Sequence, residues 1–339
     1  MTAEGDYTLR AYAPGDEAAI QRAFAEVFGP GRALEEWRWK FLSPPRGSRI
    51  VLAFDAAGEL VCQYAAITVD VAWSGLPLRA AQIVDVFSRR RRALGPRGGP
   101  FLRTLEAFLE GCAAPGGVGF VYGFPSARHQ RAGAVAGRYF EPAALERLSR
   151  ALVSSAGSVS AASGGRWSGA RTWISEGFDA HATDRLWLRS RGRYPFATVR
   201  DAAWFLWRYE RRPGVHYLQL GVRRAGEPRA WGVLALSGGS AAPGGATARW
   251  VDLLWDGENP LDLVDLSAAI AQRADAHGAE VVELWLRGDP TARAVLLDQG
   301  FASAPEPLLR LSAIAFDAQV SVAQVLASFY LTMGDSDHF

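Results

Sequence analysis

The stretch Trp39-Lys40-Phe41, followed by Pro45, recurs in this sequence as Trp207-Arg208-Tyr209, followed by Pro213. The aromatic-basic-aromatic triplet and the proline reappear at the same spacing along the chain, 39 to 207 and 45 to 213. Self-similarity at a fixed spacing indicates a repeated structural unit. The motif therefore predicts two copies of one unit in tandem.

The sequence next to this motif repeats as well. Ala57-Gly58-Glu59 recurs as Ala225-Gly226-Glu227 at the spacing of the Trp motif, and each triplet lies between two β-type runs. Glycine supplies the positive φ that a tight hairpin turn needs. The four predicted strands cover residues 50–54 and 61–68 in the first copy and 217–222 and 230–236 in the second.

A strand that leads into a helix follows in each copy. Residues 83–87 correspond to residues 250–254, and both strands carry an aspartate, Asp85 and Asp252, at almost the same spacing. Apolar residues then recur at helical spacing, and a buried-type strand, a short helix and a Gly-aromatic pair complete each copy. We therefore predict an α/β fold class with α+β mixed sheets. Two tandem domains each have a mixed, mostly antiparallel sheet flanked by helices.

Length and composition fit this organisation. A chain of 339 residues has room for two domains of about 150 residues each. The predicted division is 1–150, a connecting segment 151–190 that includes a Ser-, Gly- and Ala-rich stretch, and 191–339 with a C-terminal tail.

The charge balance and the cysteine count exclude several function classes. The 37 basic and 35 acidic residues give a net charge of +2, which makes no case for nucleic-acid or membrane binding. Two cysteines, Cys62 and Cys112, cannot form a disulfide framework or a cysteine zinc site, and we expect buried thiols and no metal. The polar start and the lack of a long apolar run predict a cytoplasmic protein.

The order of elements resembles the GCN5-related N-acetyltransferase superfamily. Gly123-Phe124-Pro125-Ser126 with the later Gly137, and the second copy's Gln299-Gly300-Phe301, resemble the ending of that fold. The tail 332–337 resembles the tails of a bacterial subgroup with two such domains per chain. The resemblance covers most of residues 7–339. It implies an N-acetyltransferase or other acyltransferase that uses acetyl-CoA or another acyl-CoA as cosubstrate.

In that superfamily the turn between strand and helix binds the CoA pyrophosphate. The first copy has several arginines and glycines at residues 88–101, and arginine pairs well with phosphate. The family pattern fits either Arg92 to Gly95 with Arg97, or Arg97-Gly98-Gly99; we favour the second fit, and a solvated basic loop is the alternative. The predicted cofactor-binding residues are Val86, Phe87, Ser88, Arg92, Arg97, Gly98, Gly99, Pro100 and Phe101.

The second copy differs at the equivalent turn, residues 255–260. That turn has no arginine, one glycine and two acidic residues, which would repel a pyrophosphate. We predict that the second copy is degenerate for CoA and that the first copy carries the acyl-CoA site.

Acyl transfer needs an acid and a base. The resemblance implies Tyr139 as the acid, with a core aromatic residue as the alternative role. Asp85 is a possible base, although its counterpart Asp252 favours a structural role for both. His129 has a suitable ordinary pKa, but an exposed helical histidine is the alternative. This chain also resembles mycobacterial aminoglycoside acetyltransferases, which look like tandem units too and use the chain's terminal carboxylate as base. That resemblance implies the carboxylate of Phe339 as base here, although those proteins carry a further domain before their terminus.

The sequence thus predicts an acyl-CoA-dependent N-acyltransferase acting on a small amine or amino-sugar acceptor by direct transfer. A longer acyl chain or a hydroxyl acceptor is the alternative among enzymes. A non-catalytic binding protein of the same fold is the alternative outside them. The expected partner is a small-molecule amine, with no nucleic acid or membrane, and the chain is expected to be a monomer or homodimer.

Overall fold

The computed structural model describes residues 7–29, 31–74, 76–89, 99–127, 129–131, 142–152, 170–175, 179–236 and 246–338. The chain forms two compact units that interleave along the sequence. Unit 1 comprises Met1–Val71, Pro77–Ala143 and Leu308–Leu326, and unit 2 comprises Ala72–Leu76, Ala144–Pro307 and Ala327–Phe339. The predicted division cuts the chain at residues 150 and 190 instead, and the roles given to those domains stay predictions.

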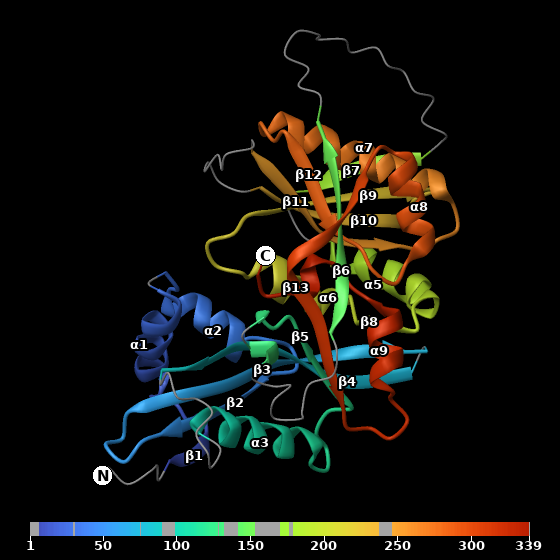
Figure 1. Ribbon diagram of the computed structural model, residues 1–339. Coiled ribbons are helices and arrows are strands. Elements are labelled where there is room, and N and C mark those ends of the chain that lie inside the picture. Colours follow the sequence, from blue (N-terminus) through green and yellow to red (C-terminus); the bar gives the residue numbers. More distant parts are fainter. Residues whose placement is uncertain are drawn as a thin grey trace. The chain divides into compact units, whose positions relative to one another are not determined.

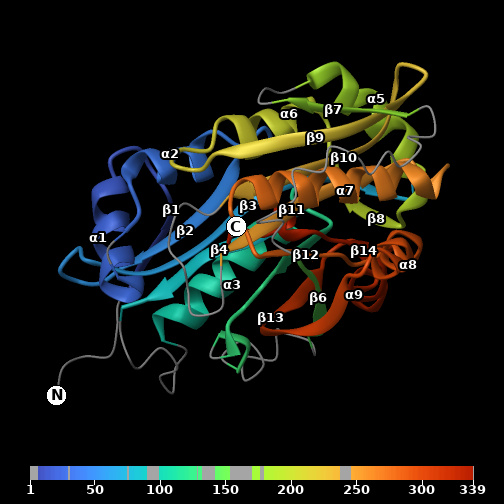
Figure 2. The same cartoon turned by 90° about the horizontal axis from the view of Figure 1, so that it is seen from above.

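Unit 1 is built on a mixed sheet with the strand order β1-β2-β3-β4-β5-β13 (Figure 1). Its elements are β1 (Thr8–Ala11), α1 (Glu17–Phe28), α2 (Leu34–Leu42), β2 (Ser48–Phe54), β3 (Leu60–Trp73), β4 (Leu76–Ser88), α3 (Pro100–Ala113), β5 (Phe120–Gly123) and the end of β13 (Ala302–Ala315). The pairs β1/β2, β2/β3 and β5/β13 are antiparallel, and β4/β5 is parallel. Helices α1 and α2 cover one face of this sheet and α3 covers the other (Figures 1 and 2).

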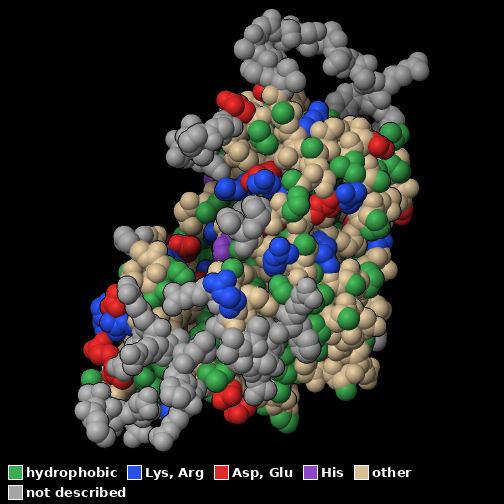
Figure 3. All heavy atoms as spheres, viewed as in Figure 1, with side chains coloured by type: hydrophobic (Ala, Val, Ile, Leu, Met, Phe, Trp, Pro, Cys, Tyr) green, Lys and Arg blue, Asp and Glu red, His purple; other side chains and the backbone are tan. Residues whose placement is uncertain are grey.

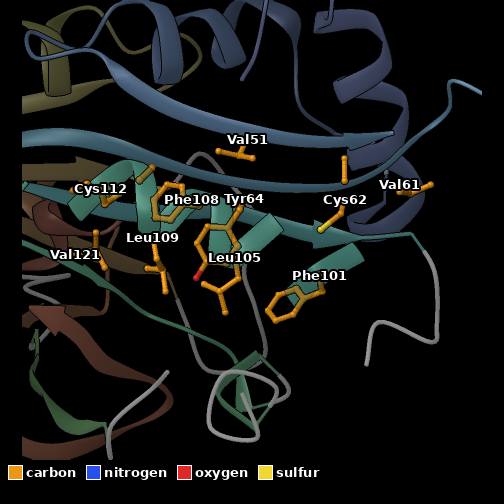
Figure 4. Packing of buried hydrophobic residues seen from close by; sticks show 13 residues of the cluster. Val51, Val61, Cys62, Tyr64, Phe101, Leu105, Phe108, Leu109, Cys112 and Val121 are labelled. Carbon is orange, nitrogen blue, oxygen red and sulfur yellow. The ribbon is translucent and has the colours of Figure 1, made fainter. Parts of the chain in front are cut away.

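The core of unit 1 lies between α3 and the sheet. The predicted helical apolar pattern becomes the buried face of α3, and Tyr64 of β3 packs its ring 4.7 Å from that of Phe108 (Figure 4). Both cysteines lie in this core as free thiols, as predicted. Burial raises the pKa of Cys62 to about 12 and that of Cys112 to about 11, so both stay protonated at neutral pH.

Unit 2 repeats the plan with the strand order β7-β9-β10-β11-β12-β6. Its strands are β6 (Ala143–Ala151), β7 (Ala170–Ser175), β8 (Phe196–Thr198), β9 (Tyr217–Arg224), β10 (Glu227–Leu236), β11 (Thr247–Trp255), β12 (Val281–Trp285) and β14 (Phe329–Tyr330). Its helical segments are α5 (Ala180–Ser190), η1 (Arg191–Arg193), α6 (Ala202–Phe205), η2 (Leu206–Glu210), α7 (Pro260–Ala276), α8 (Pro290–Asp298) and η3 (Met333–Asp335), and α9 (Val322–Ser328) precedes β14. Helices α5 and α7 both pack on β10.

The two sheets share one pattern of neighbours. In each, an antiparallel meander ends in a strand that pairs in parallel with the next, β4 with β5 and β11 with β12. The next strand in each, which we call the closing strand, is antiparallel: β13 beside β5 and β6 beside β12; the strand order continues from β13 to β6. The predicted fold class, two mixed and mostly antiparallel sheets flanked by helices, is confirmed.

Each closing strand comes from the other copy's stretch of sequence. Strand β13 follows the second copy's Gly300-Phe301 but pairs through Ser312–Ala315 with β5, beside which it is drawn in red (Figure 1). Strand β6 follows the first copy but pairs with β12 of unit 2. This exchange is why the compact units interleave, and a linear repeat pattern carries no sign of it.

The surface carries charges of both signs. Basic and acidic side chains are interspersed over the face shown in Figure 3, in keeping with the near-zero net charge. No helix in the described ranges is long and apolar enough to cross a membrane.

Candidate functional site

The strands β4 and β5 separate in the middle of unit 1. Their parallel register runs from Ala80 opposite Phe120 to Ile83 opposite Gly123. Strand β4 then continues to Ser88, whereas β5 ends at Gly123. The backbone groups of β4 beyond Ile83 are therefore not paired with β5, and this edge forms the opening of unit 1. The predicted cofactor residues Val86, Phe87 and Ser88 lie on this last part of β4.

The helix that follows the opening begins without a side-chain cap. Gly99 is the N-cap residue of α3 and has no side chain with which to cap it, and Pro100 is the first helical residue. The amides of Leu102 and Arg103 both point to the Gly99 carbonyl, at 3.0 and 3.3 Å. Pro100 has no N–H, so this helix start offers an anion the Phe101 amide and the positive end of the helix dipole.

Four helices of unit 2 begin with a capping side chain. Asp179 caps α5, Asp201 caps α6, Asn259 caps α7 and Asp289 caps α8. In unit 1, α1 and α2 also lack a side-chain cap, but α3 is the helix that follows the strand leaving its parallel partner. Helix α7 is the repeat counterpart of α3, so the two copies differ at the position where the predicted CoA turn lies.

The structure separates the predicted cofactor residues by role. The Phe101 ring is buried in the core and Pro100 is buried too, so these residues could serve a ligand through their backbone. Phe87 is also buried, with its ring edge-on to Phe24 at 6.5 Å and to Phe28 at 6.3 Å. Arg92, Arg97 and Gly98 lie outside the described residues.

The first arginine of the basic run has a structural role. Arg89 Nε lies 2.6 Å from Glu26 of α1, Nη1 donates to the Leu60 carbonyl at 3.0 Å, and the backbone amide donates to the Val61 carbonyl at 2.9 Å. These bonds fix the point where the chain leaves β4 and enters the predicted phosphate turn.

Asp85 lies in a buried ion-pair cluster. Its carboxylate contacts the Arg32 guanidinium and, at 3.1 Å, the Lys40 ammonium. Gln63 Nε2 donates to the Asp85 carbonyl at 3.0 Å, and the residue has a left-handed φ of 49°, which is uncommon for a non-glycine residue. The residue thus interrupts the regular strand where β4 leaves β5.

The same ion pair exists in unit 2. Arg200 Nε lies 2.9 Å from Asp252, and both side chains are fully buried. The spacing from Arg32 to Arg200 equals that of the Trp motif, and the two aspartates correspond as well, so the pair is part of the duplicated unit. The sequence analysis missed the two arginines, although their spacing was the signal that could have found them. The pairing supports the structural role for Asp85; its catalytic role stays a prediction.

The remaining catalytic predictions divide into two groups. His129 is not an exposed helical residue: its ring meets those of Tyr64 and Phe101 edge-on, at 6.0 and 5.5 Å. Burial lowers the pKa of His129 to about 4, so the imidazole is neutral at pH 7. Tyr139 and Phe339 lie outside the described residues, and their roles stay predictions.

In unit 2 the turn equivalent to the CoA turn is closed by its own side chains. Asn259 Oδ1 accepts from the Leu261 amide at 3.1 Å, which caps α7. The Arg193 guanidinium lies against Gly257 so closely that a Cβ there would be 0.9 Å from Nη1. Arg229 pairs with Asp256 at 3.0 Å and also contacts Glu258. The two acids predicted to repel phosphate are thus neutralised by an arginine of the same unit.

The opening of unit 2 is occupied by the C-terminal part of the chain. The parallel register of β11 and β12 ends at Arg249 opposite Glu283. Beyond it, Tyr330 donates its hydroxyl to the Leu253 carbonyl of β11 at 2.5 Å. Leu331 exchanges two backbone hydrogen bonds with Arg287, just after β12, at 3.0 and 3.2 Å. The segment therefore contacts β11 through the Tyr330 hydroxyl and the chain just after β12 through the Leu331 backbone.

No group of metal-binding side chains was found within the described ranges. Among the described residues, the candidate site of unit 1 thus comprises the part of β4 that extends beyond its register with β5 and the start of α3 at Gly99. Its counterpart in unit 2 is filled and capped.

Solved structures share this architecture. A conserved protein of Enterococcus faecalis, described as a probable N-acyltransferase, matches with a TM-score of 0.65 and 12% identity over 92% of this chain and 73% of that chain. A GCN5-related N-acetyltransferase from Kribbella flavida matches with a TM-score of 0.63 and 16% identity over 92% and 72%. No protein-family model and no curated protein sequence matches this chain.

These matches identify the class: the chain has the fold of the GCN5-related N-acetyltransferases, as the sequence resemblance predicted. Within that class it has the tandem form. A tandem protein of this fold from the clavulanic acid biosynthesis pathway matches with a TM-score of 0.56 and 14% identity, over 92% of this chain and 99% of that chain.

Proposed function

We propose that the chain is an acyl-CoA-dependent N-acyltransferase that binds its cosubstrate, most simply acetyl-CoA, in unit 1. The acceptor is a small amine or amino sugar, and the transfer is direct. The observation that carries this proposal is the contrast between the two helix starts: α3 begins at Gly99 without a side-chain cap, whereas α7 is capped by Asn259. Backbone N–H groups at an uncapped helix start, together with arginines of the preceding segment, are the groups that bind a pyrophosphate.

The proposed position of CoA follows from the elements of unit 1. The pyrophosphate lies at the start of α3, held by backbone amides of the turn and by Arg97. The pantetheine arm, an extended chain with amide groups, lies along the unpaired edge of β4. The segment at Tyr330–Leu331 supports this position: in the equivalent opening of unit 2 the Tyr330 hydroxyl bonds to β11, and the Leu331 backbone makes amide hydrogen bonds beside β12.

The proposed reaction conserves atoms and protons. The amine nitrogen attacks the thioester carbonyl, the new C–N bond forms, and the C–S bond breaks to release CoA thiol and the amide. In this proposal, backbone N–H groups of the β4 edge stabilise the oxyanion of the tetrahedral intermediate. The amine must lose a proton and the thiolate must gain one, and Tyr139 is the proposed donor to the thiolate.

Calorimetry tests the proposal directly. Acetyl-CoA and a desulfo analogue are titrated into the wild type, into Arg97→Glu and into Arg22→Glu, a control on the exposed side of α1. We expect one CoA per chain, affinity weakened by roughly tenfold or more in Arg97→Glu, and unchanged affinity in the control. Absence of binding to the wild type would refute the acyltransferase proposal in favour of a binding protein that has lost the reaction. Unchanged binding by Arg97→Glu would move the phosphate site away from this turn.

A further inference from the structure

The last turns of the chain are among its most buried residues. Phe329, Tyr330 and Leu331 have no exposed surface, and Thr332, Met333 and Ser336 expose 1% each. The segment Phe329–Ser336 is therefore a built part of unit 2, and its contacts show what kind of site it fills.

Two arginines hold this segment by its polar groups. Arg200 Nη2 donates to the Asp335 carboxylate at 2.6 Å and to the Thr332 hydroxyl at 3.1 Å. Arg208 donates to the carbonyls of Gly334 and Ser336, at 3.1 and 2.6 Å. The segment thus places a carboxylate and main-chain carbonyls against buried cations, as a peptide ligand would.

Asp252 receives the other polar groups. Its carboxylate accepts hydrogen bonds from the Tyr209 hydroxyl and from the Thr332 hydroxyl, both at 2.8 Å. Burial raises the pKa of Asp252, and the nearby Arg200 charge opposes that rise. The segment therefore completes a network in which the Arg200 guanidinium lies between two aspartates, Asp252 and Asp335.

Two glycines allow the close backbone contact. Gly288 has a φ of 78°, and a Cβ there would lie 2.8 Å from the Tyr330 Cα. A Cβ on Gly334 would lie 2.2 Å from the Tyr209 hydroxyl and 3.0 Å from the Asp252 carboxylate. Gly288 lies in the part of unit 2 that contacts the segment, and Gly334 lies in the segment itself. The lack of a side chain at both positions allows the close contact.

The conserved arginine of the ion pair has a different second partner in each unit. Arg32 there pairs with Asp85, and its Nη2 donates to Gln21 of α1 at 2.8 Å. Arg200 pairs with Asp252 in the same way, but its Nη2 bonds with the C-terminal segment. The segment supplies the second partner that a helix of the same copy supplies in unit 1.

We infer that the opening of unit 2 is an intramolecular peptide-binding site whose ligand is the chain's own segment Phe329–Ser336. The bound segment excludes any cosubstrate from unit 2, so that each chain takes up one acyl-CoA. The CoA part of this inference rests on the proposed function; the peptide site does not.

Hydrogen exchange measured by mass spectrometry tests the site in the full chain. Gly334→Ala removes the room for the segment, and Gly192→Ala is the matched control, because a Cβ at Gly192 meets nothing within 4 Å. We expect exchange of residues 329–336 and of β11 to speed up by roughly tenfold or more in Gly334→Ala, with α3 unchanged. The control should match the wild type. Protection of 329–336 that survives Gly334→Ala, or that is absent in the wild type, would overturn the inference.

Asp335→Asn provides a second variant if Gly334→Ala fails to fold. It keeps the size of the side chain and removes the charge that faces Arg200, and we expect faster exchange confined to the segment and its walls. Calorimetry with acetyl-CoA separates the two proposals. Two CoA molecules bound per wild-type chain would overturn the inference that the segment excludes cosubstrate from unit 2. No bound CoA would refute only the proposed function.

Discussion

The ion pair Arg32–Asp85 of unit 1 recurs in unit 2 as Arg200–Asp252, and this recurrence indicates its role. Each aspartate lies on the strand that leaves its parallel partner, and each arginine comes from the segment before the Trp motif. A catalytic base would have no reason to persist in a copy whose opening is filled by peptide. The pair therefore fixes the departing strand in both units, and we expect stability to depend on it.

Asp85→Asn tests this role. The substitution leaves Arg32 and Lys40 buried without their shared counter-charge, which should lower the free energy of unfolding by about 3 kcal/mol. Urea unfolding measures that loss. If the role of Asp85 is structural, the pH dependence of kcat/KM should keep its shape. A variant with wild-type stability that has lost the acidic limb of the pH profile would instead make Asp85 the base.

His129 should make the protein less stable in mild acid. Burial lowers the pKa of the folded-state imidazole to about 4, below its ordinary value of 6.5. Between these values the unfolded chain takes up a proton that the folded chain does not, so stability falls as the pH drops from 6.5 to 4. His129→Phe should remove about 3 kcal/mol of that loss, measured by urea unfolding at several pH values. The exposed His216→Phe serves as control, and an unchanged pH dependence in His129→Phe would contradict the buried neutral ring.

At the scale of elements, the equivalent helices α3 and α7 differ in how their N-termini are capped. Both helices begin with proline after a strand that leaves its partner. In α7 a side chain satisfies a first-turn amide, and Arg193 lies over the turn. In α3 the N-cap is a glycine, so the first-turn amides have no side-chain acceptor in their own cap. The difference is local, and in our proposal it decides which copy holds the CoA phosphate.

Gly99→Asp separates stability from binding. Its backbone angles, φ −56° and ψ 179°, suit any residue, and an aspartate would cap α3. We expect the free energy of unfolding to rise by about 1 kcal/mol while the CoA affinity falls by roughly tenfold or more, through competition and repulsion. The converse control, Asn259→Ala, should lose about 1 kcal/mol with unchanged CoA affinity. A capped α3 that binds CoA as tightly as the wild type would place the pyrophosphate elsewhere.

For the whole molecule, the exchange of closing strands makes the two copies depend on each other for folding. The sheet of unit 1 is closed by Ser312–Ala315, and the sheet of unit 2 by β6. A break in the chain after residue 160 gives fragments 1–160 and 161–339, each of which lacks the strand that closes its own sheet.

We expect neither fragment alone to fold stably, because each exposes an unpaired strand edge and the core beneath it. Neither should therefore show a cooperative unfolding transition. Co-expressed fragments should assemble into a folded complex that shows one gel-filtration peak and a native circular dichroism spectrum. Fragment 1–160 with a sharp thermal transition of its own would show that unit 1 does not need β13.

The sequence by itself determined the repeat, the order of elements and the difference between the two turns, because these are local: hairpin glycines, helical periodicity and the charges of a short turn are read along the chain. Only the tertiary structure decided which strand closes which sheet, that Arg32 meets Asp85, and that the C-terminal segment fills unit 2. Each of these joins residues far apart in sequence, as Arg200 and Asp335 are. Such pairings depend on which partner excludes water from a buried charge or strand edge, and spacing along the chain does not encode that choice.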